Sequence, residues 1–341
     1  MTSVPSVVLA VPPSSTATSS PASGDEPANT PLAKFGRSEP FGDWAYRAFT
    51  TACALSIPLL LVVLGIVIVR AAWPAIVTHG GDLVAGRTWD VAHERFGALP
   101  AVVGTLLSSA LALLVATPLA IGAAIFTSEL APQRLRAPVA FLIDLLAAIP
   151  SVVYGLWGLF VLVPILRLYV MPSLEASLGG LPLFRGPIYG PSLLAAGLVL
   201  AIMILPYIAA VSREVLAAVP RAQREAALAL GATRLEVIRD AVLPYARSGL
   251  VGGVMLGLGR ALGETMAVTM VIGNRHAIPS SLFDPAYTMA SLLANEFGEA
   301  STDGHMSALM AVAGLLLVIT LVVNMLARWL VWRVRRLEGA R

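Results

Sequence analysis

The stretch EAALALGATRLEVIRDAVLP, Glu225 to Pro244, carries five charged residues in a chain that is 57% hydrophobic. Gly231 interrupts the stretch, and a glycine there can end a helix in a left-handed conformation. Thr233 and Glu236 then have the T-x-x-E spacing of a capping box, which starts a helix. Pro220, just upstream, suits the first turn of the preceding helix. The stretch therefore predicts a helix, a tight turn and a second helix, all lying outside a membrane.

The composition around this stretch is that of a membrane protein. The 341 residues have a mean hydropathy of +0.82 and only 13% charged residues, against roughly a quarter in a soluble domain. The net charge of +3 is better explained by membrane topology than by nucleic-acid binding. A single cysteine, Cys53, excludes an intrachain disulfide. The histidines lack zinc-site spacing, so we interpret His79, His93, His276 and His305 as solvated loop residues and expect no metal or cofactor in this chain.

Residues 1–40 have a different composition. They are rich in Pro, Ser, Thr and Ala and contain few large apolar side chains, so they cannot bury enough surface to offset chain entropy. A basic n-region is missing and the apolar run SVVLAV is short, which argues against a secretory signal. We therefore expect a disordered segment, residues 1–40, followed by one membrane domain, residues 41–341.

Six stretches are long and apolar enough to cross a bilayer, which takes about 20 residues. The predicted spans are Thr51–Val69, Val102–Phe126, Val139–Leu166, Ser192–Val211, Leu250–Ile272 and Ser307–Trp329. Pro118, Pro150, Pro164 and Pro206 fall within or near the ends of these spans, where they predict kinks. The third span is long enough to tilt or to run past the bilayer. The predicted fold is therefore all-α, a polytopic membrane protein with six transmembrane helices.

The basic residues predict the orientation of these spans, because lysine and arginine gather on the cytoplasmic side. With the N-terminus inside, the cytoplasmic segments hold sixteen of the 23 basic residues and the external segments hold six. Both termini are therefore expected in the cytoplasm. The connection 212–248, which contains the opening stretch, is expected there too.

On pattern alone the opening stretch fits a solvated amphipathic connector as well as a docking element. Its full string resembles the EAA loop of ABC-importer permeases, and the matching residues here are Glu225, Ala226, Ala227, Gly231, Leu243 and Pro244. That family usually has an isoleucine two residues before the Leu-Pro pair, where this chain has Ala241. The resemblance implies a type I ABC-importer permease fold. It also implies that these residues dock onto a separate cytoplasmic ATPase.

A second stretch, GGVMLGLGRALGETMAVTMVIGN (Gly252 to Asn274), is apolar but contains Arg260 and Glu264. Ionisable residues inside a membrane are costly and indicate function. The two residues are four apart, so we expect them to share a helix face. Two roles stay open for them. They form a structural salt bridge, or Arg260 offers its planar fork of donors to a passing oxyanion and Glu264 holds the arginine when no anion is bound.

Other polar and small residues of the spans predict packing. Asp144, in the third span, is expected to pair with an arginine or polar group of a neighbour. Small hydroxyl side chains are common at helix interfaces, and we interpret Thr105, Ser108 and Ser109 in this way. Three glycines at four-residue spacing predict that another helix approaches the fifth span closely: Gly249, Gly253 and Gly257.

GRALGETMAVTMVIGN, together with AAIPSVVYGLWGLFVLVP (Ala147–Pro164), is similar to the PstC-type permeases of phosphate ABC importers over roughly residues 45–335. The resemblance implies import of inorganic phosphate across the cell membrane by alternating access. It maps the family's arginine and glutamate of phosphate passage onto Arg260 and Glu264. It also implies a PstA-like second permease, a PstB-like ATPase dimer that binds ATP and Mg, and a PstS-like external phosphate-binding protein. The external loops 70–98, 167–191 and 274–306 are the natural docking surface for that binding protein, and their charges are interpreted as solvated.

Alternatives from the same and from other classes stay open. A permease for another oxyanion, sulfate or molybdate, fits the EAA loop equally well. An ion-coupled secondary transporter or a channel needs no ATPase, but leaves the charged stretch at 225–244 without a purpose. An enzyme is disfavoured, because the sequence has no G-x-x-x-x-G-K-[ST] loop and no converging His/Cys/Asp set. The chain is therefore expected to be a permease that hydrolyses no ATP itself.

Overall fold

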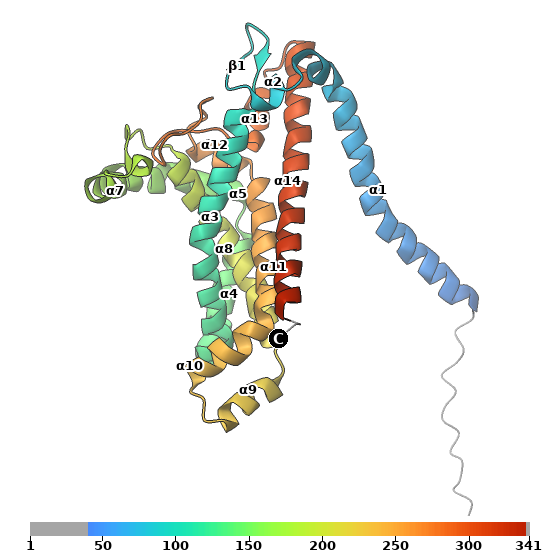
Figure 1. The fold of residues 1–341 in the computed structure, drawn as a ribbon, viewed down its shortest axis with the longest axis vertical. Coiled ribbons are helices and arrows are strands. Elements are labelled where there is room, and N and C mark those ends of the chain that lie inside the picture. Colours follow the sequence, from blue (N-terminus) through green and yellow to red (C-terminus); the bar gives the residue numbers. More distant parts are fainter. Residues whose placement is uncertain (1–39, 339–341) are drawn as a thin grey trace, which may run out of the picture. The chain divides into compact units, whose positions relative to one another are not determined.

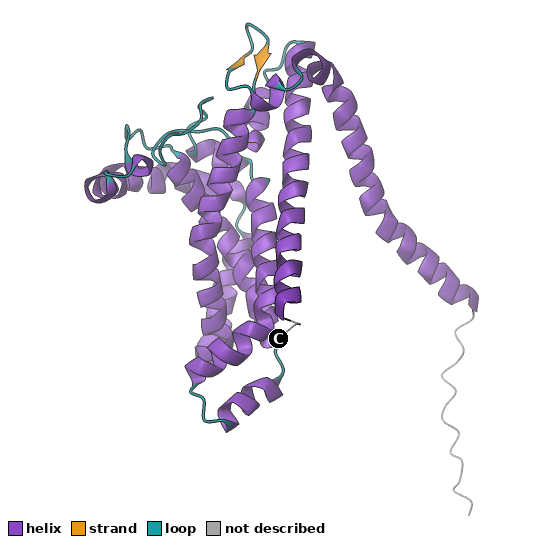
Figure 2. Cartoon of the chain, viewed as in Figure 1, coloured by secondary structure: helices purple, strands orange, loops and turns teal. Residues whose placement is uncertain are grey.

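The computed structural model describes residues 40–338, so the predicted disordered segment lies, except for its last residue, outside the described residues. Helix α1 (Pro40–His79) crosses the boundary between two compact units, which divide between Leu59 and Leu60. The fold from residue 60 onward is helical with one small antiparallel hairpin, β1 (Trp89–Asp90) and β2 (Arg95–Phe96), in which Trp89 lies opposite Phe96 (Figure 2).

The remaining α-helices follow in chain order: α2 (Asp82–Ala85), α3 (Leu99–Ile125), α4 (Gln133–Ala148), α5 (Ser151–Trp157), α6 (Val163–Ile165), α7 (Met171–Leu178), α8 (Leu193–Ala217), α9 (Arg221–Ala229), α10 (Arg234–Glu236), α11 (Leu243–Leu262), α12 (Met266–Val271), α13 (Met289–Glu296) and α14 (Asp303–Glu338). Wider π-helical turns join some of them: η1 (Phe126–Leu130), η2 (Gly158–Leu162), η3 (Leu166–Val170) and η5 (Val237–Val242). A 3₁₀ turn, η4, covers Pro182–Phe184.

Within residues 40–338, six helical segments are long and apolar enough to cross a membrane, which confirms the predicted all-α architecture with six spans. They are Gly42–His79, Leu99–Leu130, Ser151–Leu178, Leu193–Ala217, Arg234–Leu262 and Asp303–Trp329. Most of the predicted stretches lie within longer helices, because a hydropathy window detects the apolar middle of a span and not its polar ends. The third and fifth predicted spans differ more, because in the structure a helix ends inside each of them.

The third predicted span, Val139–Leu166, is wrong because the helix breaks inside it. Helix α4 ends at Ala148, Ile149 and Pro150 have extended backbone conformations, and the membrane-length helix begins at Ser151. Proline has no amide hydrogen and disfavours the helical conformation of the residue before it. Pro150 therefore produces a complete break where the sequence predicted a kink.

The fifth predicted span, Leu250–Ile272, is wrong at its C-terminal end, which extends past the end of the helix. Helical structure begins at Arg234 and stops at Leu262, and the short α12 starts again at Met266. The second helix of the opening stretch is therefore continuous with the helix of the fifth span, and the cytoplasmic position of 212–248 stays a prediction. The π-helical turn η5 directly precedes Pro244, and widening a helix there accommodates a residue that cannot donate the regular hydrogen bond.

Helix α8 is the centre of the bundle, since 67% of its most apolar window is buried within the chain. Figure 1 shows α3 and α11 running alongside it. The predicted glycine contacts are confirmed: a Cβ at Gly249, Gly253 or Gly257 would meet Val215, Val211 or Ile208 of α8, respectively. The absence of side chains at these glycines is what lets α11 approach α8 so closely.

Gly104 on α3 is the position where the bundle tolerates a side chain least, because a Cβ there would collide with the backbone carbonyl of Tyr287. We expect Gly104→Ala to destabilise the protein by about 1–3 kcal/mol or more, since two backbones must separate. Thermal unfolding of the purified protein in detergent measures the effect. Gly122→Ala on the same helix is the matched control, because a Cβ there meets nothing within 4 Å and alanine favours helix. Equal unfolding midpoints for the two variants would contradict the tight contact.

Candidate functional site

Arg224 fixes helix α9 to the bundle. Its guanidinium forms an ion pair with Glu129 in η1, with Nη2 2.7 Å from Oε1 and Nε 3.3 Å from Oε2. The same guanidinium donates to the carbonyl oxygens of Leu216 and Val219, at and just beyond the end of α8. One side chain thus joins α9, the end of α3 and the last carbonyls of α8. The sequence pattern does not indicate this role, since Glu129 lies 95 residues away from Arg224.

The turn after α9 has the predicted geometry. Gly231 has a left-handed φ of +85°, and Thr233 and Glu236 form both bonds of the capping box. The residues of the EAA resemblance divide between two environments. Ala227 and Leu243 pack against the buried cluster around Leu216 and Val242, while Glu225, Ala226, Gly231 and Pro244 are exposed. The exposed surface also carries large apolar side chains, Leu228, Leu230 and Leu235, which are 50%, 90% and 72% exposed.

Arg224→Ala is expected to release α9 from the bundle. Its bonds join charged groups that are only 21% and 13% exposed, and losing them costs roughly 2 kcal/mol or more. Amide hydrogen exchange of residues 221–232 should therefore accelerate, while exchange in α8 and α11 changes less. Arg221→Ala removes an exposed arginine of the same helix and should leave the exchange as in the wild type. If both variants behave alike, α9 is held by something other than Arg224.

Asp144 of α4 pairs with Arg213 of α8, with the carboxylate oxygens 3.2 and 3.4 Å from Nη2. This confirms the expected pairing with an arginine of a neighbouring helix. The aspartate side chain is 53% exposed, so the pair is a modest tie between two helices.

Thr105, Ser108 and Ser109 are each 1% exposed, which agrees with their predicted packing role. Thr105 donates to the carbonyl of Ala101 within α3 and accepts from the amide of Met289, the first residue of α13. It therefore joins α3 to α13 across the bundle.

Arg260 lies in the last turn of α11 with its guanidinium on the ring of Tyr207 from α8, the carbon 4.3 Å from the ring centroid. Its Nε is buried without a hydrogen-bond partner. Within residues 40–338, none of the hydrogen bonds or ion pairs found engages this guanidinium. Among the described residues the arginine is thus a cation without a carboxylate partner, near the C-terminal end of a membrane-length helix.

Glu264 does not share a helix face with Arg260, so the predicted pairing along one helix is wrong, while the roles of the two residues in phosphate passage stay predictions. Helix α11 ends at Leu262, and the Glu264 carboxylate instead accepts from the amide of Ala267, in the first turn of α12. Among the described residues no ion pair joins it to Arg260. The prediction failed because it extended one helix through Gly263, whereas Glu264 lies in the break and accepts from an amide in the first turn of the next helix.

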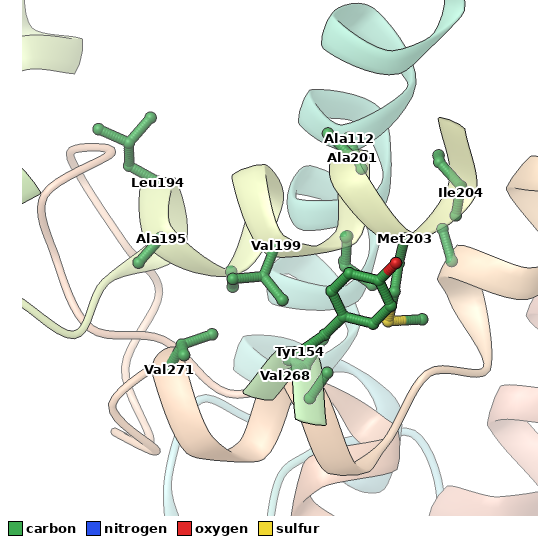
Figure 3. Close-up of a cluster of buried hydrophobic side chains, with 14 of the residues drawn as sticks. Ala112, Tyr154, Leu194, Ala195, Val199, Ala201, Met203, Ile204, Val268 and Val271 are labelled. Carbon is green, nitrogen blue, oxygen red and sulfur yellow. The ribbon is translucent and has the colours of Figure 1, made fainter. Parts of the chain in front are cut away.

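Two tyrosines complete the break between α4 and α5. The Tyr154 hydroxyl donates to the carbonyl of Leu146 at 2.7 Å, and the Tyr207 hydroxyl donates to that of Ala147 at 3.1 Å. The end of α4 therefore keeps partners for carbonyls that Pro150 leaves without helical donors. Figure 3 shows the Tyr154 ring among buried side chains of α8 and α12, including Met203 and Val268.

A carboxylate at the hairpin end of the bundle joins four segments of the chain. Glu296, at the end of α13, lies 2.9 Å from Nε2 of His276 and 3.0 Å from Nε2 of His305, and it accepts from the Trp89 indole at 2.6 Å. Trp89 also stacks on His276 at 6.0 Å between ring centroids. The interpretation of these groups as solvated is wrong for Glu296, His276 and His305, whose side chains are 14%, 27% and 4% exposed. It is right for His93, whose side chain is 75% exposed. Spacing in the sequence gave no signal, since Trp89 and Glu296 are 207 residues apart.

Burial raises the pKa of the Glu296 carboxyl, but hydrogen bonds from His276, Trp89 and His305 outweigh it and hold that pKa below its ordinary value. A lowered pKa in the folded state means that the charged carboxylate stabilises the fold at neutral pH, and that this contribution is lost as pH falls through the lowered pKa.

Acidification below the ordinary glutamate pKa of about 4.3 should therefore lower the unfolding temperature of the wild type more steeply than that of Glu296→Gln. The glutamine variant has no charge to lose, and at pH 7 it should be the less stable of the two. Thermal unfolding followed from pH 7 to pH 3.5 checks both points. Parallel curves for the two proteins would show that Glu296 contributes nothing specific.

The sequence of this chain is similar to those of membrane subunits of transport systems. The family model described as binding-protein-dependent transport system inner membrane component matches residues 116–336. A protein of Pasteurella multocida named phosphate transport system permease protein PstC is 48% identical over 298 residues, covering 86% of this chain and 93% of that protein. Its namesake in Mesorhizobium japonicum is 45% identical over 302 residues, covering 87% and 92%. Mycobacterium tuberculosis PstC 2 is 40% identical over 296 residues, covering 84% and 91%.

Solved structures share the fold at low sequence identity. A bacterial alginate ABC transporter, solved with an alginate-bound periplasmic protein, superposes with a TM-score of 0.58 at 15% identity, covering 86% of this chain and 97% of the other. The inward-facing methionine transporter MetNI gives a TM-score of 0.50 at 17% identity, covering 69% and 94%. Both similarities concern the arrangement of helices.

Proposed function

This chain belongs to the binding-protein-dependent transport system inner membrane component family, and on that premise we propose that it is a permease subunit of an ATP-driven ABC importer for inorganic phosphate. The observation that carries the proposal is its 40–48% identity, over most of its length, to permeases named for phosphate transport. The chain is a multi-pass membrane protein, with six helices of spanning length. Both termini and α9 lie on the cytoplasmic side in this proposal, as the distribution of basic residues predicts.

Coupling to ATP hydrolysis takes place through α9 and the Gly231 turn. The 341 residues contain no G-x-x-x-x-G-K-[ST] loop, so ATP and Mg are bound by a separate, PstB-like ATPase dimer. The exposed Leu228 and Leu230 offer this ATPase an apolar contact, beside Glu225 and Ala226. The Arg224–Glu129 ion pair supports the proposal, because a helix tied to the ends of α3 and α8 moves with them. A push on α9 then reaches the spans, which alternate between outward and inward access.

A second, PstA-like permease completes the pathway. One face of α11 packs on α8, but another is open: a Cβ at Gly252 or Gly259 meets nothing within 4 Å, and Leu256 is 63% exposed. An apolar, glycine-containing helix face of this kind suits a second helical subunit. At the opposite end, the segments around the hairpin and α13 receive a PstS-like binding protein that delivers phosphate.

Arg260 provides the anion contact during passage. Its free donors match the oxygens of a tetrahedral oxyanion, and a single contact of this type allows the release that transport needs. Glu264 acts differently from Arg260 in this scheme. Its carboxylate organises the start of α12 next to the arginine, and its negative charge opposes overly tight retention of phosphate.

The test is uptake of labelled phosphate by cells that lack their own phosphate importer and co-express this chain with its presumed partner subunits. We expect wild type to restore uptake that excess sulfate does not inhibit. Arg260→Ala should reduce uptake at least about 100-fold while the complex still assembles, because the anion then loses its charged contact. Glu225→Ala should lower uptake and transport-linked ATP hydrolysis together.

Three results would overturn parts of the proposal. Sulfate that competes equally with phosphate would assign the chain to another oxyanion. Normal uptake by Arg260→Ala would remove the arginine from the pathway. Uptake that persists without the ATPase subunit would favour an ion-coupled transporter or a channel.

A further inference from the structure

The face of the Arg260 guanidinium is occupied while its edge is free. The guanidinium carbon lies 4.3 Å from the centroid of the Tyr207 ring, the distance of a cation–π contact. A guanidinium is a flat ion whose N–H donors all point outward in its plane. The ring can therefore hold the ion through its face and leave the edge, including the buried and unpartnered Nε, available to an anion.

An aromatic holder differs from an acidic one in a way that matters for anion transport. A carboxylate would bind the same edge donors that an anion needs, so the anion would have to displace it. The closest acidic residue in the motif, Glu264, is engaged by the Ala267 amide instead. Tyr207 contacts the half-buried cation through its ring and does not compete for its donors.

Tyr207 itself is held in place. It follows the buried Pro206 in α8, the most buried of the membrane-length helices, and its hydroxyl donates to the carbonyl of Ala147 at 3.1 Å. That carbonyl lies at the end of α4, next to the break at Pro150. The ring is thus fixed at both ends, by its own helix and by the terminus of another.

We propose that Tyr207 is a positioning residue for substrate, whose ring fixes the Arg260 guanidinium with its edge turned to the passing phosphate. The inference rests on the proposed role of Arg260 in the phosphate pathway. Loss of the ring leaves the arginine charged but free to adopt other rotamers, which weakens the phosphate contact without removing it. The apparent KM for phosphate then rises, and the maximal uptake rate changes less.

The experiment measures phosphate uptake by the complete complex with graded replacements of Tyr207. Tyr207→Leu removes the ring and should raise KM roughly 3- to 30-fold, the range that a cation–π contact spans. Tyr207→Phe keeps the ring and removes only the hydroxyl, and should stay within about 2-fold of wild type. Tyr154→Phe is the matched control, because it removes the neighbouring hydroxyl–carbonyl bond, to Leu146, from a ring that does not stack on Arg260.

A second series of variants distinguishes the electrostatic effect of the ring from the effect of its shape. Position 207 is occupied in turn by phenylalanine and by its mono-, di- and trifluorinated forms. Each added fluorine withdraws electron density from the face of the ring with little change in side-chain volume. We expect KM to rise stepwise with fluorination while the amount of assembled complex stays constant. These variants keep the test decisive even if Tyr207→Leu does not assemble.

The outcomes distinguish this inference from the proposed function. If KM is unchanged in the leucine and fluorinated variants while Arg260→Ala abolishes uptake, Tyr207 has no positioning role and the phosphate pathway stands. If Tyr207→Phe is as impaired as Tyr207→Leu, the bond to Ala147 matters and the ring does not, which also overturns the inference. If Arg260→Ala transports normally, the arginine's role and the inference fall together.

Discussion

Each helix end inside this bundle must find hydrogen-bond partners within the protein, because hydrocarbon supplies none. The structure meets this constraint with side chains from other elements. The end of α4 uses the hydroxyls of Tyr154 and Tyr207, the end of α8 uses the guanidinium of Arg224, and α12 begins on the carboxylate of Glu264. The breaks between helices are thereby stabilised as fixed features. The residues we assign to anion passage and to ATPase coupling lie beside such breaks.

The same constraint explains which features were predictable. Local patterns were reliable: the capping box at Thr233, the left-handed Gly231 and the glycine contacts of α11 all follow from residues close together in the sequence. The six spans follow from hydropathy. The family resemblance, carried by the 225–244 and 252–274 stretches, agrees with the matched family and relatives.

Features that depend on a distant partner could not be predicted. The break at Pro150 was expected as a kink, because the two hydroxyls that stabilise a full break come from other parts of the fold. Arg260 and Glu264 have the spacing of an intrahelical pair, yet Gly263 ends the helix between them. Glu296 looked like a solvated loop charge, since its imidazole and indole partners come from three other segments. In each case composition identified an unusual residue, and only the tertiary fold identified what that residue contacts.

The unbroken helix from Arg234 to Leu262 has a mechanical consequence. It begins just after the Gly231 turn and carries Arg260 near its far end, so about 26 residues, or roughly 39 Å at the α-helical rise, separate Arg234 from Arg260. If this lever pivots near Arg234, a tilt of only about 5° displaces the far end by roughly 3 Å, which is the length of a hydrogen bond. A small rotation of this helix beside α9 is therefore amplified along its length into a movement large enough to make or break one hydrogen bond at the Arg260 guanidinium.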